Sequence, residues 1–104
     1  MTGVSVYVTA GNTDEAINIA RTLIHERLAA CANILGEITS VYRWEDAVHE
    51  DPETAIILKS RRDLVGPLTE RIKELHSYDC PCVTALDITG GNPEFLAWIE
   101  TETD

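Results

Sequence analysis

The sequence predicts one α+β domain in which two helices lie on one face of an antiparallel sheet. Three observations support this prediction. Strand-like and helix-like segments alternate along the chain, the period of the apolar positions changes between them, and glycine, asparagine or proline marks most junctions. The 104 residues, 44% of them hydrophobic and 25% charged, are typical of a single globular domain, which we place at 1–104.

The first third of the chain reads as a strand followed by a helix. Residues 4–10, VSVYVTA, are rich in β-branched side chains and are followed by glycine, which predicts a strand. Asn12 is placed to cap a helix, with Glu15 three residues further on in the capping-box position. Apolar residues then recur at helical spacing as far as Leu28, and a second extended region begins at Cys31.

The middle of the chain reads as a long hairpin. Residues 37–45 alternate with the period of a strand, the polar residues 46–52 read as a turn, and 53–61 read as the returning strand. A strand of nine residues spans about 30 Å, whereas a domain of ~100 residues has a radius of gyration near 13 Å. The hairpin should therefore project from the domain as an arm. Its apolar side chains would promote aggregation unless another subunit covered them, so we expect an oligomer.

The last part of the chain adds a helix, a strand and a short helix. Asp63 is expected to cap the second long helix, which should end near His76. Residues 82–89 read as a fourth strand, and Asn92 and Pro93 are expected to cap and open the final helix. The order βαββαβ followed by a helix is that of the ferredoxin-like split βαβ arrangement.

Composition narrows the possible partners. Eight basic and 18 acidic residues give a net charge of −10, which argues against nucleic acid and anionic membranes as partners. The charge favours cationic partners, or it simply keeps the protein soluble. No apolar run approaches the roughly 20 residues that cross a bilayer, and the N-terminal residues lack the basic start of a signal peptide. Three cysteines, an odd number, fit reduced thiols better than a disulfide framework. We therefore expect a cytoplasmic protein.

Five segments in order resemble the CutA family of divalent-cation tolerance proteins. They are RLAACANI at 27–34, YRWE at 42–45, ETAIILKS at 53–60, RIKELHSYDCP at 71–81 and FLAWI at 95–99. The resemblance covers nearly the whole chain. It implies a ferredoxin-like fold, a cytoplasmic homotrimer similar to that of the nitrogen-regulatory PII proteins, and a link to tolerance of copper and other divalent metals. It implies no particular reaction.

The resemblance also identifies recurrent family positions, and we expect all of them except His76 at a subunit interface or in a cleft between subunits. In this chain they are Cys31, Asn33, Tyr42, Trp44, Glu53, Lys59, His76 and Tyr78. The chain departs from the family motif around the histidine, because Ser77 replaces a proline and Asp79 replaces a glutamate. Losing the proline frees the backbone where the second helix ends.

A metal site is predicted around that departure. His76, Cys80 and Cys82 form the pattern H-x3-C-x-C, with Asp79 between them, and imidazole and thiolate are good copper ligands. Alternatives remain open for each residue. The histidine could simply cap the helix, and the cysteines could be buried or inert thiols, or surface thiols prone to oxidation. Side chains at i and i+2 of a strand lie roughly 7 Å apart, too far to share one ion unless the chain turns at Pro81.

The remaining candidates have two interpretations each. Tyr42 and Trp44 could anchor a subunit interface or line a ligand cleft. Glu53 and Lys59 lie in phase on one strand and could form an interface ion pair, or the lysine could bind an anion. Cys31 is expected to pack as a small hydrophobe, and its pairing with a histidine as a nucleophile is the remote alternative.

Three functions follow from these patterns. The first is a trimeric, non-enzymatic tolerance protein that binds copper or another divalent cation and no organic cofactor. The second is a PII-like regulator that binds a small ligand in the cleft between subunits. The third is a structural trimer whose recurrent residues only hold the interface. The sequence contains no phosphate-binding loop, dinucleotide fingerprint or zinc-protease motif, so no enzyme class is predicted.

Overall fold

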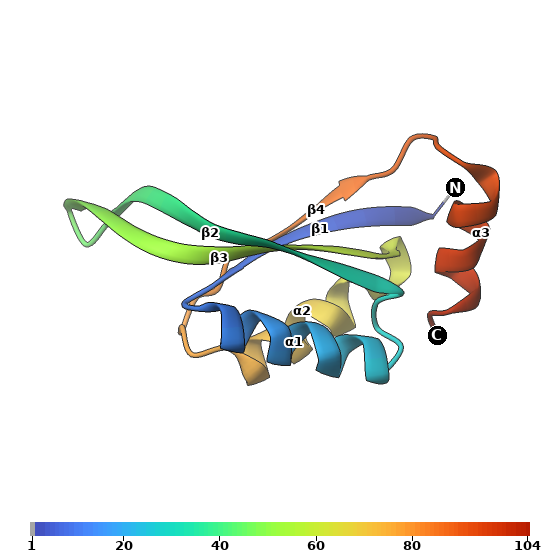
Figure 1. Cartoon of the computed structure of the whole chain (residues 1–104), viewed down its shortest axis with the longest axis horizontal. Coiled ribbons are helices and arrows are strands. Elements are labelled where there is room, and N and C mark those ends of the chain that lie inside the picture. The colour runs from blue at the N-terminus through green and yellow to red at the C-terminus, as the bar shows by residue number, and fades with distance from the viewer. Residues whose placement is uncertain (1) are drawn as a thin grey trace.

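The computed structural model describes residues 2–104, which form a four-stranded antiparallel sheet with helices α1 and α2 on one face (Figure 1). The elements are β1 (Gly3–Ala10), α1 (Thr13–His25), β2 (Cys31–Trp44), β3 (Ala47–Arg61), a 3₁₀ turn (Arg62–Leu64), α2 (Val65–Leu75), β4 (Val83–Asp87) and α3 (Pro93–Thr101). The strand order is β2-β3-β1-β4. The predicted ferredoxin-like α+β fold with an extra C-terminal helix is therefore confirmed.

Two of the three predicted helix caps are present. Asn12 Oδ1 accepts a hydrogen bond from the backbone N–H of Glu15 at 2.8 Å, and the Asn92 side chain caps α3 in the same way. The Glu15 carboxylate reaches back to the N–H of Gly11 at 2.9 Å, one residue before the cap. The prediction for Asp63 is wrong, because the chain first makes a 3₁₀ turn there, and α2 begins at Val65 without a side-chain cap.

The hairpin of β2 and β3, here called the arm, is longer than predicted. Its turn consists of Glu45 and Asp46 alone, both with positive φ (+49° and +63°), so most of the predicted turn 46–52 belongs to β3. Two consecutive left-handed residues give a turn whose twist matches that of the paired strands. The arm projects from the domain, as predicted, and the molecule measures 44 × 25 × 23 Å, with a radius of gyration of 14.1 Å (Figure 1).

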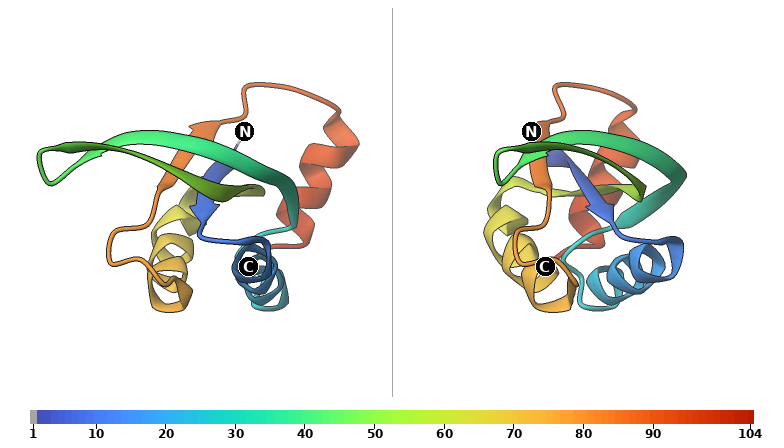
Figure 2. Two further views of the ribbon diagram at one scale, coloured as in Figure 1. Left: turned by 60° about the vertical axis from the view of Figure 1, so that its left-hand side comes forward. Right: turned by 90° about the vertical axis from the view of Figure 1, so that its left-hand side faces the viewer.

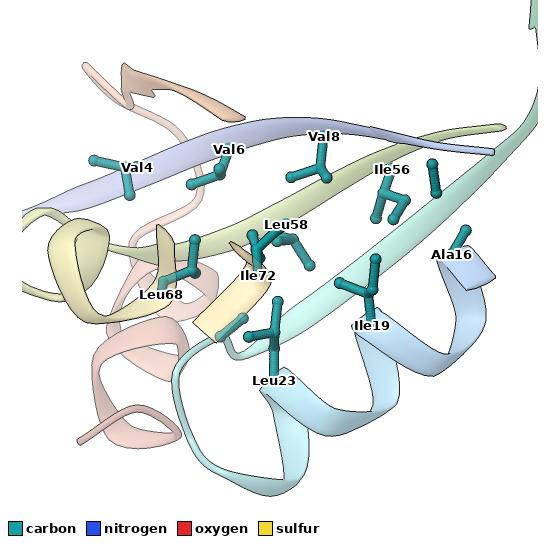
Figure 3. Packing of buried hydrophobic residues seen from close by; sticks show 12 residues of the cluster. Val4, Val6, Val8, Ala16, Ile19, Leu23, Ile56, Leu58, Leu68 and Ile72 are labelled. Atoms are coloured by element: carbon teal, nitrogen blue, oxygen red, sulfur yellow. The ribbon is translucent and has the colours of Figure 1, made fainter. Parts of the chain in front are cut away.

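The core lies between the sheet and helices α1 and α2 (Figure 3). It is formed mainly by Val4, Val6, Val8, Ile19, Leu23, Ile56, Leu58, Leu68 and Ile72. Even-numbered residues of β1 pair with even-numbered residues of β3, so these residues share the face that the helices cover. The odd-numbered residues, including Tyr7 and Ile57, lie on the opposite face, which α1 and α2 leave uncovered (Figure 2).

Helix α3 packs at one end of the sheet. Its buried residues Leu96 and Ile99 form a second small cluster with Ala30. The chain end is tied down beside it, because the N–H of Asp104 donates to the carbonyl of Arg27 at 3.1 Å.

None of the helices in residues 2–104 combines the length and the apolar character needed to cross a membrane.

Candidate functional site

Most of the predicted site residues line one groove of about 990 Å³, which we call the arm groove. One wall is the arm, which contributes Tyr42, Trp44 and Glu53 among the predicted residues. The other wall is the segment 77–82 between α2 and β4, which contributes Tyr78, Asp79, Cys80 and Cys82. Two sets of residues that the sequence suggested separately, a metal set and an interface set, thus meet in one place.

The register of the arm explains which of its side chains face the groove. Tyr42 pairs with His49, and Ser40 pairs with Asp51, so alternate residues of both strands share one face. On that face the Tyr42 hydroxyl donates to Asp51 Oδ2 at 2.6 Å, and this hydrogen bond raises the pKa of the tyrosine. The Tyr42 ring also stacks on His49, with 5.4 Å between ring centroids. The sequence did not identify Asp51 as a site residue, because residues 46–52 read as a turn, whereas Asp51 lies in β3.

A second tyrosine joins the two walls of the groove. The Tyr78 hydroxyl, from the segment 77–82, donates to Glu53 Oε2 on the arm at 3.0 Å. Burial, together with the hydrogen bond to Glu53 and the charge of that carboxylate, raises the pKa of Tyr78 to about 12. At neutral pH Tyr42 and Tyr78 are therefore protonated donors, and each of them holds one carboxylate in place.

Tyr78 should affect both the stability and the ultraviolet absorbance of the protein at alkaline pH. Because the pKa of Tyr78 is raised from 10.0 to about 12 in the folded protein, its contribution to stability is fully present below pH 10. That contribution is lost as the pH rises from 10.0 to about 12. In an ultraviolet titration of the folded protein, we expect a late tyrosinate phase that is absent from Tyr78→Phe and moves to lower pH in Glu53→Gln. A late phase that survives in Tyr78→Phe would assign it to another residue.

His76 is buried beneath the groove rather than facing it. Its side chain is fully buried, and Nε2 lies 2.7 Å from the carbonyl oxygen of Thr9. Nδ1 accepts the backbone N–H of Tyr78 at 3.0 Å. Because a carbonyl only accepts, Nε2 carries the proton, and both ring nitrogens are already used inside the chain. His76 does end α2, as predicted, but its ring bonds to β1 and not to the open carbonyls of its own helix.

The four-residue metal site predicted from the sequence is therefore not assembled within one chain. Across residues 2–104, no three histidine, cysteine, aspartate or glutamate side chains meet in an arrangement that could hold a metal ion. His76 is withdrawn from the groove by its two hydrogen bonds. Asp79, Cys80 and Cys82 remain in the groove wall.

Glu15 holds the segment 77–82 against α1, a role that the sequence did not suggest beyond helix capping. Its carboxylate accepts the backbone N–H groups of Gly11 at 2.9 Å and Ser77 at 2.8 Å. Burial alone would raise the pKa of Glu15, but these hydrogen bonds outweigh it, and the pKa is lowered. The departure from the family motif matters here, because a proline at position 77 would have no N–H to donate.

The two groove cysteines are accessible. Cys80 and Cys82 are both exposed, and β4 begins only at Val83, so neither lies in a strand. The alternative in which both thiols are buried is wrong. Partial burial raises the pKa of the Cys82 thiol, although a hydrogen bond with the Thr9 side chain opposes the shift.

The remaining predicted residues lie outside the groove. Cys31 pairs with Lys59, and Asn33 pairs with Ile57, on the part of the sheet nearer α3. The sheet register separates Cys31 from His76, whose ring bonds to Thr9, so the two do not form a nucleophile and base. Burial raises the pKa of the Cys31 thiol, as expected for a packed cysteine. No carboxylate of residues 2–104 comes within 4.0 Å of Lys59, so its ion pair across a subunit interface stays a prediction.

The chain is similar to known proteins in both sequence and fold. Residues 4–102 match the family described as CutA1 divalent ion tolerance protein. The divalent-cation tolerance protein CutA of Pyrococcus horikoshii is 45% identical over 98 residues, which are 94% of this chain and 95% of that protein. The chloroplastic CutA of Arabidopsis thaliana is also 45% identical over 94% of this chain, but this chain spans only 54% of its length.

The solved structures agree with the sequence match. The crystal structure of CutA1 from Oryza sativa superimposes with a TM-score of 0.97 at 43% identity, covering 100% of this chain and 95% of that chain. This chain spans about half the length of the plant and mouse relatives it matches. The match over residues 4–102 and the shared fold show that the chain belongs to the CutA1 family of divalent ion tolerance proteins.

Proposed function

We propose that this protein is a non-enzymatic homotrimer that binds divalent cations, copper among them, in the arm groove. The observation that carries this proposal is the charge of the groove. Asp51, Glu53 and Asp79 line it, and none of its lining residues is lysine or arginine. Carboxylate oxygens are ligands for divalent cations, and the net charge of −10 favours their approach.

The arm supports the oligomeric part of the proposal. Near its tip, Val41 and Val48 are each 62% exposed, and Trp44 is 53% exposed. An apolar patch of this kind on a projecting hairpin is typical of a surface that another subunit covers. A neighbouring subunit would also supply the ligands that one chain lacks, since no three metal-binding side chains meet within residues 2–104.

The test is a Cu²⁺ titration by calorimetry, with molar mass measured by light scattering in the same samples. It uses a thiol-free chain, Cys31→Ser/Cys80→Ser/Cys82→Ser, so that Cu²⁺ is not reduced by cysteine. We expect a trimer that binds Cu²⁺, and at least about a tenfold loss of affinity in Asp51→Asn/Glu53→Gln. The matched control is Asp46→Asn/Glu50→Gln, which removes the same charge from the arm at positions outside the groove. Equal loss in both variants, no binding, or a monomer would overturn the proposal.

The size of the groove favours a second candidate, the PII-like regulator. Its volume of about 990 Å³ lies within the range of small-molecule sites, and Tyr7, Tyr42, Trp44 and Tyr78 give it aromatic walls. An acidic groove with aromatic walls suits an organic cation, for which choline is the probe. Fluorescence of Trp44 in a Trp98→Phe background, recorded with a metal chelator present, separates the two. A saturable change with choline supports the regulator, whereas a response to metal alone supports cation binding.

A further inference from the structure

The contact between the two walls of the arm groove depends on a buried histidine. The His76 side chain is fully buried, and its Nε2–H donates to the carbonyl of Thr9 on β1 at 2.7 Å. Its Nδ1 accepts the backbone N–H of Tyr78 at 3.0 Å. The Tyr78 hydroxyl in turn donates to Glu53 Oε2 on the arm at 3.0 Å. One unprotonated ring nitrogen therefore positions the residue that joins the segment 77–82 to the arm.

One carboxylate lies close to that nitrogen. The groups that face the ring are Glu15 of α1, the Thr9 carbonyl of β1 with the Cys82 thiol beside Thr9, the Tyr78 ring and, behind its hydroxyl, Glu53 of β3. Glu15 Oε2 lies 4.0 Å from Nδ1 and accepts the N–H of Ser77 at 2.8 Å. Among residues 2–104, no lysine or arginine forms an ion pair with Glu15. Its charge is therefore available to a proton on the imidazole.

Protonation of Nδ1 would turn an acceptor into a donor. Histidine changes its charge between about pH 5 and 8, and both nitrogens of the imidazolium are donors. Nδ1 could then no longer accept the N–H of Tyr78, because two donors would face each other. The buried ring has no water to meet the new N–H, and an unsatisfied buried donor is costly, so the donor would turn to Glu15.

Glu15 is suited to receive this proton in a hydrogen bond. Burial alone would raise its pKa, but hydrogen bonds from Gly11 and Ser77 outweigh burial and lower it. Glu15 therefore stays ionised at a pH at which a histidine becomes protonated. The ring thus has two arrangements, one bonded to Tyr78 and the other to Glu15.

We propose that His76 is a pH-dependent switch that closes the arm groove at neutral pH and opens it at mildly acidic pH. The imidazole takes one proton from solvent, donates it in a hydrogen bond to the Glu15 carboxylate and releases the N–H of Tyr78. The segment 77–82 then moves away from the arm, which separates Asp79 from Glu53. The inference rests on the proposed function for its consequence, which is that a cation bound between the two walls is released by acid.

The experiment is an NMR titration from about pH 8 to about pH 5, the range in which histidine changes charge, with no metal or ligand present. It uses a His25→Gln/His49→Gln chain, in which His76 is the only histidine. We expect the ring to change from a proton on Nε2 alone to a proton on both nitrogens. Over the same pH range, the exchange protection of the Tyr78 amide should fall by at least about fivefold, the effect of one hydrogen bond.

Two further variants test the parts of the switch. Glu15→Gln removes the charge that receives the proton and should move the ring transition to lower pH. Asp14→Asn is the matched control, because Asp14 is exposed in the same turn of α1 and should leave the transition in place. Opening of the groove is followed by Trp44 fluorescence in a Trp98→Phe background, which should change together with the ring and stay constant in His76→Gln.

Four results would overturn the inference. They are a ring that stays neutral throughout the titration, a Tyr78 amide that keeps its protection when both nitrogens are protonated, an equal shift of the transition in Glu15→Gln and Asp14→Asn, and a Trp44 response that survives in His76→Gln. Failure here is distinguishable from failure of the proposed function, because this titration contains no cation, whereas the calorimetric titration measures the binding of Cu²⁺ itself.

Discussion

Leu58→Ala is expected to lower the free energy of unfolding by about 2–5 kcal/mol. Leu58 is fully buried in the middle of β3, where it pairs with Val6 on one side and Ala32 on the other. The helices cover it from below, with Leu23 and Ile72 in the same cluster (Figure 3). Truncation removes apolar contacts from both layers and leaves a cavity that the sheet is too rigid to close.

Chemical denaturation at one fixed protein concentration measures this loss, because the stability of an oligomer depends on concentration. Leu35→Ala is the matched control, since it makes the same change at a side chain that is 54% exposed. It should cost no more than about 1 kcal/mol. An equal loss of unfolding free energy in the two variants would mean that burial within one chain does not determine the cost of truncating Leu58.

His76→Leu is expected to cost about 2–4 kcal/mol, even though leucine is apolar and of similar size. The substitution leaves the carbonyl of Thr9 and the N–H of Tyr78 without the partners they have at 2.7 and 3.0 Å. Unlike the previous change, it also loosens the wall of the groove, because the N–H of Tyr78 is fixed by the imidazole ring.

Denaturation and hydrogen exchange read out the two parts of this prediction. The amide of Tyr78 should exchange faster in His76→Leu, whereas amides in the middle of α1 should change only with global stability. His25→Leu is the control, because that histidine is exposed at the last turn of α1. If the Tyr78 amide kept its protection in His76→Leu, the ring would not be what holds the segment 77–82.

The main elements of the fold could be predicted because local chemistry specifies them. Asparagine side chains cap α1 and α3, and β1 has β-branched residues in alternation. The turn of the arm could not be predicted, because the polar residues 46–52 look like a loop. Pro52 strengthened that impression, yet β1 pairs with β3 only from Thr54 onward. At Pro52 one side of β3 is thus an edge, where a residue without an N–H is tolerated.

The candidate site was predictable as a set of residues but not as an arrangement. Tyr42, Glu53 and Tyr78 are recurrent positions in the resemblance, and all three line the groove. The orientation of His76 depends on the carbonyl of Thr9, 67 residues away. The position of a main-chain carbonyl cannot be predicted from a pattern of side chains. The hydrogen bond from the N–H of Ser77 to Glu15 could not be predicted either, because its donor is also a main-chain group.

The central place of β1 in the sheet has a consequence for the order in which the chain is made. β1 leaves the ribosome first, but its partners are Thr54–Arg61 on one side and Val83–Asp87 on the other. The arm, by contrast, consists of β2 and β3, which follow each other in the chain. These two strands can pair as soon as β3 has been synthesised. During synthesis β1 therefore has no strand to pair with at first. The four-stranded sheet can be completed only after β4 has been synthesised.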